Sequence, residues 1–296
     1  MPVAARTYRA WKQAHHQPAT RTITDAIVED AIRSLAYKRK EDGTIKRTAE
    51  GLYGRRKMTA AIRRRVPGAT RGAVDRAMRS LGLAGVRRGR AARTTIPGRD
   101  GNRAGDLLNR DFTAAAPNRV WVADFTYVRT WAGFVYVAFI VDVYAQRIIG
   151  WHADTIQATE LVDLPLRMGL WQRGREGHPV ERGQLVAHSD AGSQYTSIRF
   201  TEHLHLEGIQ PSIGTVGDAY DNSLMESIIG LFKTEAIRTE VFHEGPYRKL
   251  SDVEFATAGW VDWWNNQRLH SSIGHLTPIE YEQLHYAALE AEPNLI

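Results

Sequence analysis

Three carboxylates stand at places in the sequence where acidic residues are unusual. Asp124 lies within the apolar and aromatic run Val120–Tyr127, and Asp190 follows a short strand pattern, Gln184–His188. Glu226 belongs to a later helical pattern. Because an acid among apolar neighbours is costly without a partner or a metal ion, these positions indicate a functional site. Hard oxygen ligands from separate elements suit divalent cations such as Mg²⁺.

Such a site points to phosphoryl transfer. Two cations held about 3.5–4 Å apart would activate the attacking oxygen and stabilise the leaving oxygen of a phosphodiester. Each acid also has a structural alternative. Ser223-x-x-Glu226 fits a capping box, Asp190 could be a turn residue, and Asp124 could pair with one of the many arginines.

The elements that would position these acids form an α/β pattern. Three strands joined by short turns predict an antiparallel meander, and later strands alternate with helices, which predicts a mixed sheet with flanking helices. The expected strands are Val120–Tyr127, Phe134–Tyr144, Arg147–His152, Gln184–His188 and Ile209–Ile213. The expected helices lie around Leu161–Leu170, Ser197–Leu206 and Ser223–Ile237, and Gly214–Tyr220 is expected to be a loop.

The N-terminal part differs in charge and pattern. Residues 51–99 contain fourteen Lys or Arg residues and one acid, Asp75, which indicates a surface for a polyanion. Helical patterns at 23–37, 53–66 and 70–81, the last capped by Thr70, predict a small all-α domain. The turn Pro67-Gly68 fits a helix-turn-helix, although any small helical bundle would give a similar pattern. The DNA-binding candidates here are Arg55, Arg56, Lys57 and Arg71.

Composition limits the other possibilities. The chain of 296 residues has no cysteine, which excludes disulfides, a thiol nucleophile and cysteine zinc sites. Its longest apolar run, Phe134–Val141, is too short to span a membrane, so we expect a cytoplasmic protein with no membrane partner. We predict a helical DNA-binding region at 1–86, a basic linker at 87–118, the catalytic core at 119–285 and a tail at 286–296.

Several motifs support the three acids together. Lys233 lies two helical turns after Glu226, and 35 residues separate Asp190 from Glu226. The motifs are Trp121–Tyr127, His188–Ser197, Tyr220–Ser227 with Lys233–Glu235, and Trp264–His270 leading to Thr277–Glu280. With these motifs the chain resembles the DDE transposases and retroviral integrases, in particular the OrfB-type transposases of the IS-three insertion-sequence family. The family usually has a basic residue or glutamine where this chain has Ala191.

The resemblance implies a ribonuclease-H-like core in which Asp124, Asp190 and Glu226 are catalytic and hold two Mg²⁺ or Mn²⁺ ions. It implies double-stranded DNA as partner, at the element's terminal inverted repeats and at the target, in a bacterial, nucleoid-associated homo-oligomer. An upstream-frame DNA-binding protein, separate or fused, is a further implied partner. Lys233 follows the third acid, and Arg268 follows the tryptophan-rich helix, so both are expected to contact phosphates.

The expected reaction is transposition. Water attacks a phosphodiester at the element end, and the freed 3′ hydroxyl then attacks another phosphodiester. Two alternatives remain at this point: a nuclease or resolvase of the same fold, and a non-catalytic DNA-binding repressor derived from a transposase.

Overall fold

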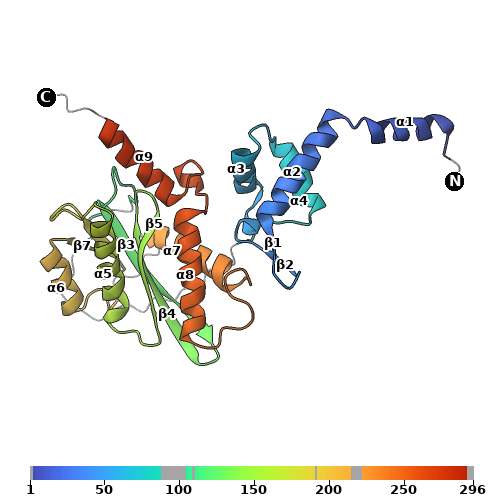
Figure 1. Ribbon diagram of the computed structural model, residues 1–296. Helices are drawn as coiled ribbons and strands as arrows, with labels where there is room; N and C mark the ends of the chain where they lie inside the picture. The colour runs from blue at the N-terminus through green and yellow to red at the C-terminus, as the bar shows by residue number, and fades with distance from the viewer. Residues whose placement is uncertain (1–2, 88–104, 109–110, 191, 215–221, 292–296) are drawn as a thin grey trace. The chain divides into compact units, whose positions relative to one another are not determined.

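The protein contains two compact units, Met1–Val86 and Arg87–Ile296. The structure is a computed structural model that describes residues 3–87, 105–108, 111–190, 192–214 and 222–291 (Figure 1). Within these residues no helix is both long and apolar enough to cross a membrane. Residues 215–220 of the predicted loop and most of the predicted linker lie outside the described residues.

The first unit is mostly helical. Its elements are α1 (Ala5–His16), α2 (Thr20–Ala36), β1 (Tyr37–Arg39), β2 (Ile45–Arg47), the short 3₁₀ turn η1 (Glu50–Leu52), α3 (Arg55–Arg65) and α4 (Arg71–Ser80). Val28 and Ile32 of α2 pack in a core with Met58 and Ile62 of α3 and with Val74 of α4. Thr70 caps α4 as predicted, because its hydroxyl accepts a hydrogen bond from the Ala73 N–H.

The first unit is not all-α as predicted, because β1 and β2 form an antiparallel hairpin. Its turn contains Asp42-Gly43, and Gly43 takes a positive φ of 84°, which glycine adopts at little cost. Helix α2 also begins earlier than the predicted range 23–37, because its first residue is Thr20 and its N-cap is Ala19. Within this helix, Asp25 accepts two hydrogen bonds from Arg76 of α4, which lower the pKa of Asp25.

The second unit has a ribonuclease-H-like mixed sheet, as predicted. Its strands are β3 (Val120–Thr130), β4 (Gly133–Asp142), β5 (Arg147–Asp154), β6 (Val186–Ser189) and β7 (Gln210–Ile213), in the order β5-β4-β3-β6-β7. Strands β3, β4 and β5 form the predicted antiparallel meander, and β6 and β7 continue the sheet in parallel with β3. The helical elements are α5 (Glu160–Arg175), α6 (Ile198–Glu207), α7 (Ser223–Phe232), the π-helical turn η3 (Lys233–Ile237), α8 (Leu250–Asn266), η4 (Ser271–Ile273) and α9 (Pro278–Ala291).

Each face of this sheet has its own core. On one face Trp121 and Ile140 pack with Leu166 of α5 and Phe200 of α6. Here α5 approaches β5 so closely that a Cβ added to Gly150 would lie 2.0 Å from the carbonyl oxygen of Pro165.

On the opposite face Phe139 meets Phe232 of α7 and Trp260 of α8, with ring centroids 5.1 and 5.9 Å away. Trp260, Trp263 and Trp264 of α8 are all buried.

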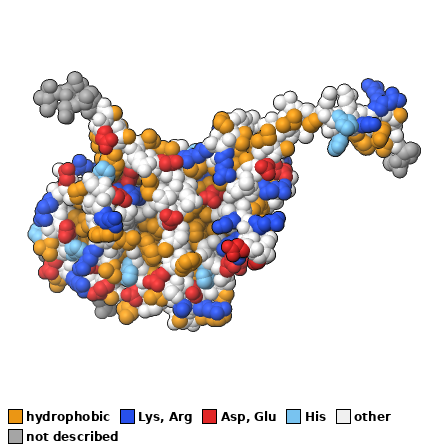
Figure 2. All heavy atoms as spheres, in the orientation of Figure 1, with side chains coloured by type: hydrophobic (Ala, Val, Ile, Leu, Met, Phe, Trp, Pro, Cys, Tyr) orange, Lys and Arg blue, Asp and Glu red, His pale blue; other side chains and the backbone are white. Residues whose placement is uncertain are grey.

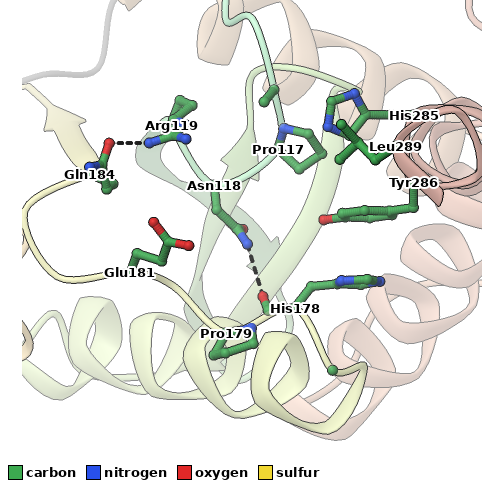
Figure 3. Close-up of a pocket in the computed structure, with 12 residues that line it drawn as sticks. Pro117, Asn118, Arg119, His178, Pro179, Glu181, Gln184, His285, Tyr286 and Leu289 are labelled. Atoms are coloured by element: carbon green, nitrogen blue, oxygen red, sulfur yellow. Dashed lines mark hydrogen bonds between the residues drawn. The ribbon is translucent and has the colours of Figure 1, made fainter. Parts of the chain in front are cut away.

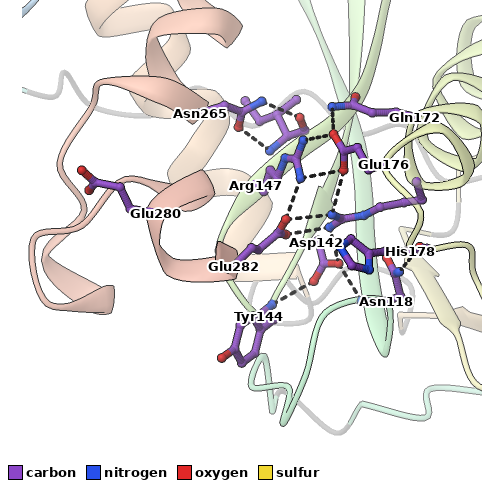
Figure 4. Close-up of polar contacts among 12 residues, drawn as sticks. Asn118, Asp142, Tyr144, Arg147, Gln172, Glu176, His178, Asn265, Glu280 and Glu282 are labelled. Carbon is purple, nitrogen blue, oxygen red and sulfur yellow. Dashed lines mark hydrogen bonds and ion pairs between the residues drawn. The ribbon is translucent and has the colours of Figure 1, made fainter. Parts of the chain in front are cut away.

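A buried cluster of ion pairs ties α9 to the sheet and to α5 (Figure 4). Arg173 is 0% exposed and lies 2.9 Å from Asp142 and 2.7 Å from Glu282. Arg147 contacts Glu282 at 2.6 Å and Glu176 at 2.5 Å. The two buried guanidinium groups therefore share the carboxylate that α9 supplies.

Part of the predicted linker packs on the sheet of the second unit. The Leu107 N–H donates to Ser212 Oγ (2.9 Å), and the Ile213 N–H donates to the Gly105 carbonyl oxygen (3.4 Å). Asp106 also lies 3.8 Å from the buried His188. Residues 105–108 thus run beside β7, a contact that a composition rich in Gly, Ala, Asn and Arg did not suggest.

Candidate active site

The sheet brings Asp124 and Asp190 onto neighbouring strands. Strands β3 and β6 are parallel with Ala123 opposite Ser189, so the two aspartates occupy the next register position. Asp190 follows directly after the last residue of β6. As predicted, Asp190 lies at the C-terminal end of its strand, which is where sites form in such sheets, and Asp124 lies beside it within β3.

The charges of the acids act on one another. Burial and the neighbouring charge of Asp190 raise the pKa of Asp124 well above its ordinary value. Glu226 raises the pKa of Asp124 further, whereas Lys233 lowers it. Burial also raises the pKa of Asp190, against the effect of a hydrogen bond from the Gly192 N–H to its Oδ1 (3.0 Å). A bound cation would relieve this repulsion.

Helix α7 begins beside this pair and carries Glu226 in its first turn. Asn222 is the N-cap residue, and its side-chain Nδ2 donates to the carbonyl oxygen of Ala123 (3.2 Å). Since the helix begins at Ser223, Glu226 is the fourth helical residue and is not placed as the N3 acid of a capping box. The bond to Ala123 fixes the start of α7 next to the strand residue before Asp124.

The donor chemistry of the three acids fits a hard divalent cation. Carboxylate oxygens are the ligands that Mg²⁺ prefers, and one oxygen of Asp124 is oriented by the Phe125 N–H (2.7 Å). As they stand, however, no three acidic or histidine side chains of the described residues are arranged to hold a metal ion together. Ala191 and the segment 215–221, which flank the acids in the chain, lie outside the described residues.

Lys233 lies close to Asp124 and to the aromatic ring of Tyr127. It is the first residue of η3, and its Nζ lies 4.9 Å from the ring centroid of Tyr127. Burial and the charge of Arg238 lower the pKa of Lys233, whereas Asp124 raises it. Its ammonium group is therefore within electrostatic reach of Asp124.

Tyr195 is a member of this site that the sequence pattern did not single out. The residue is 2% exposed, and its hydroxyl has no hydrogen-bond partner among the described residues. Burial and the charges of Asp124 and Asp190 raise the pKa of Tyr195 well above its ordinary value. Its position in the motif His188–Ser197 was the only available signal, and an aromatic residue there fits a core role equally well.

We expect Tyr195→Phe to separate stability from activity. The change removes a buried, unpaired hydroxyl, so the free energy of unfolding should rise by about 1 kcal/mol. DNA strand transfer should fall several-fold, because the hydroxyl next to the two aspartates is lost. Urea unfolding and a strand-transfer assay on the same preparation test both effects, and unchanged transfer would show that the hydroxyl has no part in the reaction.

The structure corrects the prediction for Arg268. Its side chain is 3% exposed and is bound in a bidentate ion pair to Glu235, with the shortest N–O distance 2.7 Å. Its guanidinium also lies 4.5 Å from the ring centroid of Trp264. Because it is buried, this side chain cannot reach a phosphate. Its ion pair with Glu235 instead supports the packing of η3 on α8. His270, two residues later, is also buried, with 3% of its surface exposed.

The predicted DNA-binding residues of the first unit lie on α3 and α4. Arg55, Arg56 and Arg71 are exposed, and Arg71 is the first residue of α4. Arg55 lies 3.2 Å from Asp75, and the Lys57 ammonium lies 5.6 Å from the ring centroid of Tyr53. We call the exposed Arg55, Arg56, Arg64, Arg65, Arg71 and Arg79 the α3–α4 basic surface. Figure 2 shows basic side chains over the helices of this unit, with acidic ones among them.

A separate pocket lies away from the acids. It has a volume of about 420 Å³ and is lined by the segment before β3, the segment after α5 and helix α9, including Asn118, Arg119, His178 and Tyr286 (Figure 3). The rings of His178 and Tyr286 stack with centroids 3.6 Å apart. None of the three acids lines this pocket.

Comparison of the sequence with known proteins identifies relatives of this chain. Two models of the integrase core domain match residues 114–219 and 207–278. The chain is 43% identical to a Mycobacterium tuberculosis protein assigned as the transposase for insertion sequence element IS986/IS6110, over 97% of both chains. It is 41% identical to the transposase for insertion sequence element IS629 of Shigella sonnei, over 97% of this chain and 90% of that protein.

Among solved structures, the chain is similar to a chain of the simian T-cell lymphotropic virus intasome in complex with PP2A regulatory subunit B56 gamma. The TM-score is 0.48 at 15% identity, covering 82% of this chain and 73% of that chain. It is also similar to the HTLV-2 integrase catalytic core domain in complex with magnesium, with a TM-score of 0.42 at 15% identity, covering 57% of this chain and 98% of that chain. On the sequence relationships, the chain belongs to the DDE transposases of insertion sequences of the IS-three type, whose catalytic part is an integrase core domain.

Proposed function

We propose that Asp124, Asp190 and Glu226 are the catalytic acids of this transposase and hold Mg²⁺ or Mn²⁺ for DNA cleavage and strand transfer at the element ends. The observation that carries this proposal is the acid pair. Asp124 and Asp190 follow paired residues on parallel strands, and burial together with the charges of Asp190 and Glu226 raises the pKa of Asp124. Such mutual repulsion is typical of carboxylates that share a cation.

In this proposal, the chain's own residues bind and orient the reacting DNA. Divalent cations, two in our proposal, supply Lewis-acid activation of the attacking and leaving oxygens when bound. Asp124 is oriented by its hydrogen bond from the Phe125 N–H, and Asp190 by the bond from the Gly192 N–H. Lys233, on the turn after α7, offers an ammonium group to a phosphate next to the reacting one.

The DNA partners are the terminal inverted repeats and the target, bound by a homo-oligomer, with an upstream-frame protein supplying further end binding. The decisive experiment incubates the full-length protein with labelled element ends and Mg²⁺. Cleavage followed by joining supports the transposase, and cleavage alone indicates a nuclease or resolvase of the same fold. Binding without cleavage indicates a repressor. The transposase relatives favour the first outcome.

Activity should follow the identity of the metal. We expect Mg²⁺ and Mn²⁺ to support cleavage, Ca²⁺ to permit DNA binding with little cleavage because of its larger and looser oxygen shell, and excess EDTA to abolish cleavage. Mg²⁺ should also raise the melting temperature, since a cation offsets the repulsion between Asp124 and Asp190. Asp124→Asn, in which this repulsion is weaker, should show a smaller rise.

A pH series provides the control for this metal prediction. An acid whose pKa is raised by folding costs stability once the pH exceeds its unfolded pKa of about 3.9. Without metal, Asp124→Asn should therefore be more stable than the wild type at pH 7, and the difference should vanish below about pH 4. Full cleavage in EDTA, or no effect of Mg²⁺ on the wild-type melting temperature, would contradict the metal assignment.

The α3–α4 basic surface should supply most of the salt-sensitive DNA affinity. We expect a fragment that starts near residue 112 to bind element ends poorly, and to show a shallower decline of affinity with salt than the full chain. Several phosphate contacts would cost about 10³-fold or more in affinity between 50 and 200 mM salt. Circular dichroism checks that the fragment is folded. Equal slopes for the two proteins on cognate and scrambled ends would show that the basic surface is not the DNA-binding module.

A further inference from the structure

The β3–β4 hairpin extends past the rest of the sheet next to the acids. Strand β6 pairs with β3 as far as Ala123, so from Asp124 onward β3 is paired with β4 alone among the described strands. Only one charged residue, Arg129, occurs from Phe125 to Ile140. The hairpin that starts at the catalytic aspartate is therefore apolar, and its single charge is positive.

Three aromatic side chains of this hairpin are exposed. Tyr127 is 39% exposed, Phe134 is 52% exposed and Trp131, at the turn, is 73% exposed. The rings of Tyr127 and Phe134 meet edge to face with centroids 5.1 Å apart. We call Tyr127, Trp131 and Phe134 the hairpin aromatic patch. Large exposed aromatic groups next to one another are typical of a binding surface.

Cations accompany the hairpin aromatic patch. The Lys233 ammonium lies 4.9 Å from the ring centroid of Tyr127, and the Arg248 guanidinium lies 5.3 Å from that of Trp131. A surface that combines aromatic faces with positive charge suits single-stranded nucleic acid, because bases stack on the rings while cations meet phosphates. A protein partner would have to remove water from the same cations without supplying phosphates to pair with them, so the surface favours nucleic acid.

Hydrogen bonds hold the hairpin tip in place. The Trp131 N–H donates to the carbonyl oxygen of Tyr247, and the Ala132 N–H donates to that of Arg248, both at 3.0 Å. The Tyr247 hydroxyl in turn donates to the carbonyl oxygen of Ala236 in η3 (3.0 Å). The turn that carries Lys233 and the hairpin tip are thus joined through one segment, and the exposed rings are pre-organised.

We propose that the hairpin aromatic patch binds unpaired nucleotides of the DNA next to the catalytic acids, with bases on Tyr127 and Phe134 and a phosphate on Lys233. This inference rests on the proposed function, because it says where the DNA strand that leaves the catalytic acids is bound. Tyr127 lies three residues along β3 from Asp124, a rise of about 10 Å that a few nucleotides cover, and the two side chains start on opposite faces of the strand. Lys233, which is in reach of both residues, connects the two places.

The test measures binding of a thymidine oligonucleotide that carries one 2-aminopurine, with full-length protein in EDTA so that no cleavage occurs. Stacking should quench the fluorescence on the wild type. We expect Tyr127→Ala to weaken binding about tenfold and to abolish the quench, whereas Tyr127→Phe keeps both. Affinity for the matching duplex should change less than twofold.

Trp171→Ala is the matched control, because Trp171 is also exposed (62%) and also carries a guanidinium, that of Arg175, 4.9 Å from its ring centroid. It lies on α5, and its replacement should leave oligonucleotide binding unchanged. Equal oligonucleotide affinity for the wild type and Tyr127→Ala would overturn the inference. Loss of self-association by Tyr127→Ala in sedimentation, with unchanged oligonucleotide affinity, would instead assign the patch to a second copy of the chain and would also overturn it.

The two proposals can fail separately. Cleavage of labelled ends in Mg²⁺ tests the acid site, and the quench in EDTA tests the hairpin aromatic patch. A wild-type protein that quenches but never cleaves refutes the proposed function and leaves the binding site supported. One that cleaves but shows no dependence on Tyr127 refutes the inference alone.

Discussion

Glu226→Gln is expected to abolish both cleavage and strand transfer while the fold and the affinity for DNA stay nearly intact. The change removes the charge that Glu226 places next to Asp124 but keeps the size of the side chain and its helix propensity. Because Glu226 is the fourth residue of α7 and not a capping-box acid, its loss should alter stability by no more than about 0.5 kcal/mol. Labelled element ends with Mg²⁺ provide the activity measurement.

Glu202→Gln on α6 is the matched control, since Glu202 is an exposed helical glutamate outside the site. This variant should transfer strands at the wild-type level. Strand transfer near the wild-type level by Glu226→Gln would remove Glu226 from the catalytic acids, whatever the behaviour of the two aspartates.

The second large effect concerns stability. Glu282→Gln should lower the free energy of unfolding by about 3–5 kcal/mol, because it leaves two buried guanidinium groups without their shared carboxylate. Arg147 donates one hydrogen bond to Glu282 and Arg173 donates two, all between 2.6 and 2.8 Å. A glutamine has one acceptor oxygen, and its amide group would face a guanidinium. Urea unfolding measures the loss.

Glu290→Gln on the same helix is the control, because Glu290 is exposed and its loss should change stability by less than about 0.5 kcal/mol. A loss below about 1 kcal/mol for Glu282→Gln would mean that the cluster in Figure 4 is relieved by rearrangement or by water.

Much of the fold followed from local patterns in the sequence. The meander β3–β5 was predictable because its strands are apolar runs separated by short turns, and α4 because Thr70 is a strong cap before an apolar face. The hairpin β1–β2 was missed because its strands are short and rich in lysine and arginine, which hid the turn signal Asp42-Gly43. Helix α1 was missed because it is polar and starts without a side-chain cap.

Local sequence was enough to propose the three acids but not to predict the contacts around them. Spacing and motif indicated Asp124, Asp190 and Glu226, and no feature of the local sequence could decide whether Glu226 was a capping residue. That depends on where α7 begins, which the bond from Asn222 to Ala123 fixes across 99 positions. Arg268 was misjudged for a similar reason, because its partner Glu235 lies 33 residues away and burial is a tertiary property.

The π-helical turn η3 constrains the number of residues in this segment of the chain as well as their types. A π turn accommodates one residue more than an α turn, so the positions after Lys233 are rotated by about 100° relative to an uninterrupted α-helix. That rotation directs Glu235 to Arg268 and to the indole N–H of Trp260, 3.2 Å from Glu235 Oε2. Deleting one residue of η3 would restore regular helix and separate this ion pair. Over evolution, this stretch should therefore tolerate substitutions at exposed positions such as Arg238, but it should not tolerate insertions or deletions.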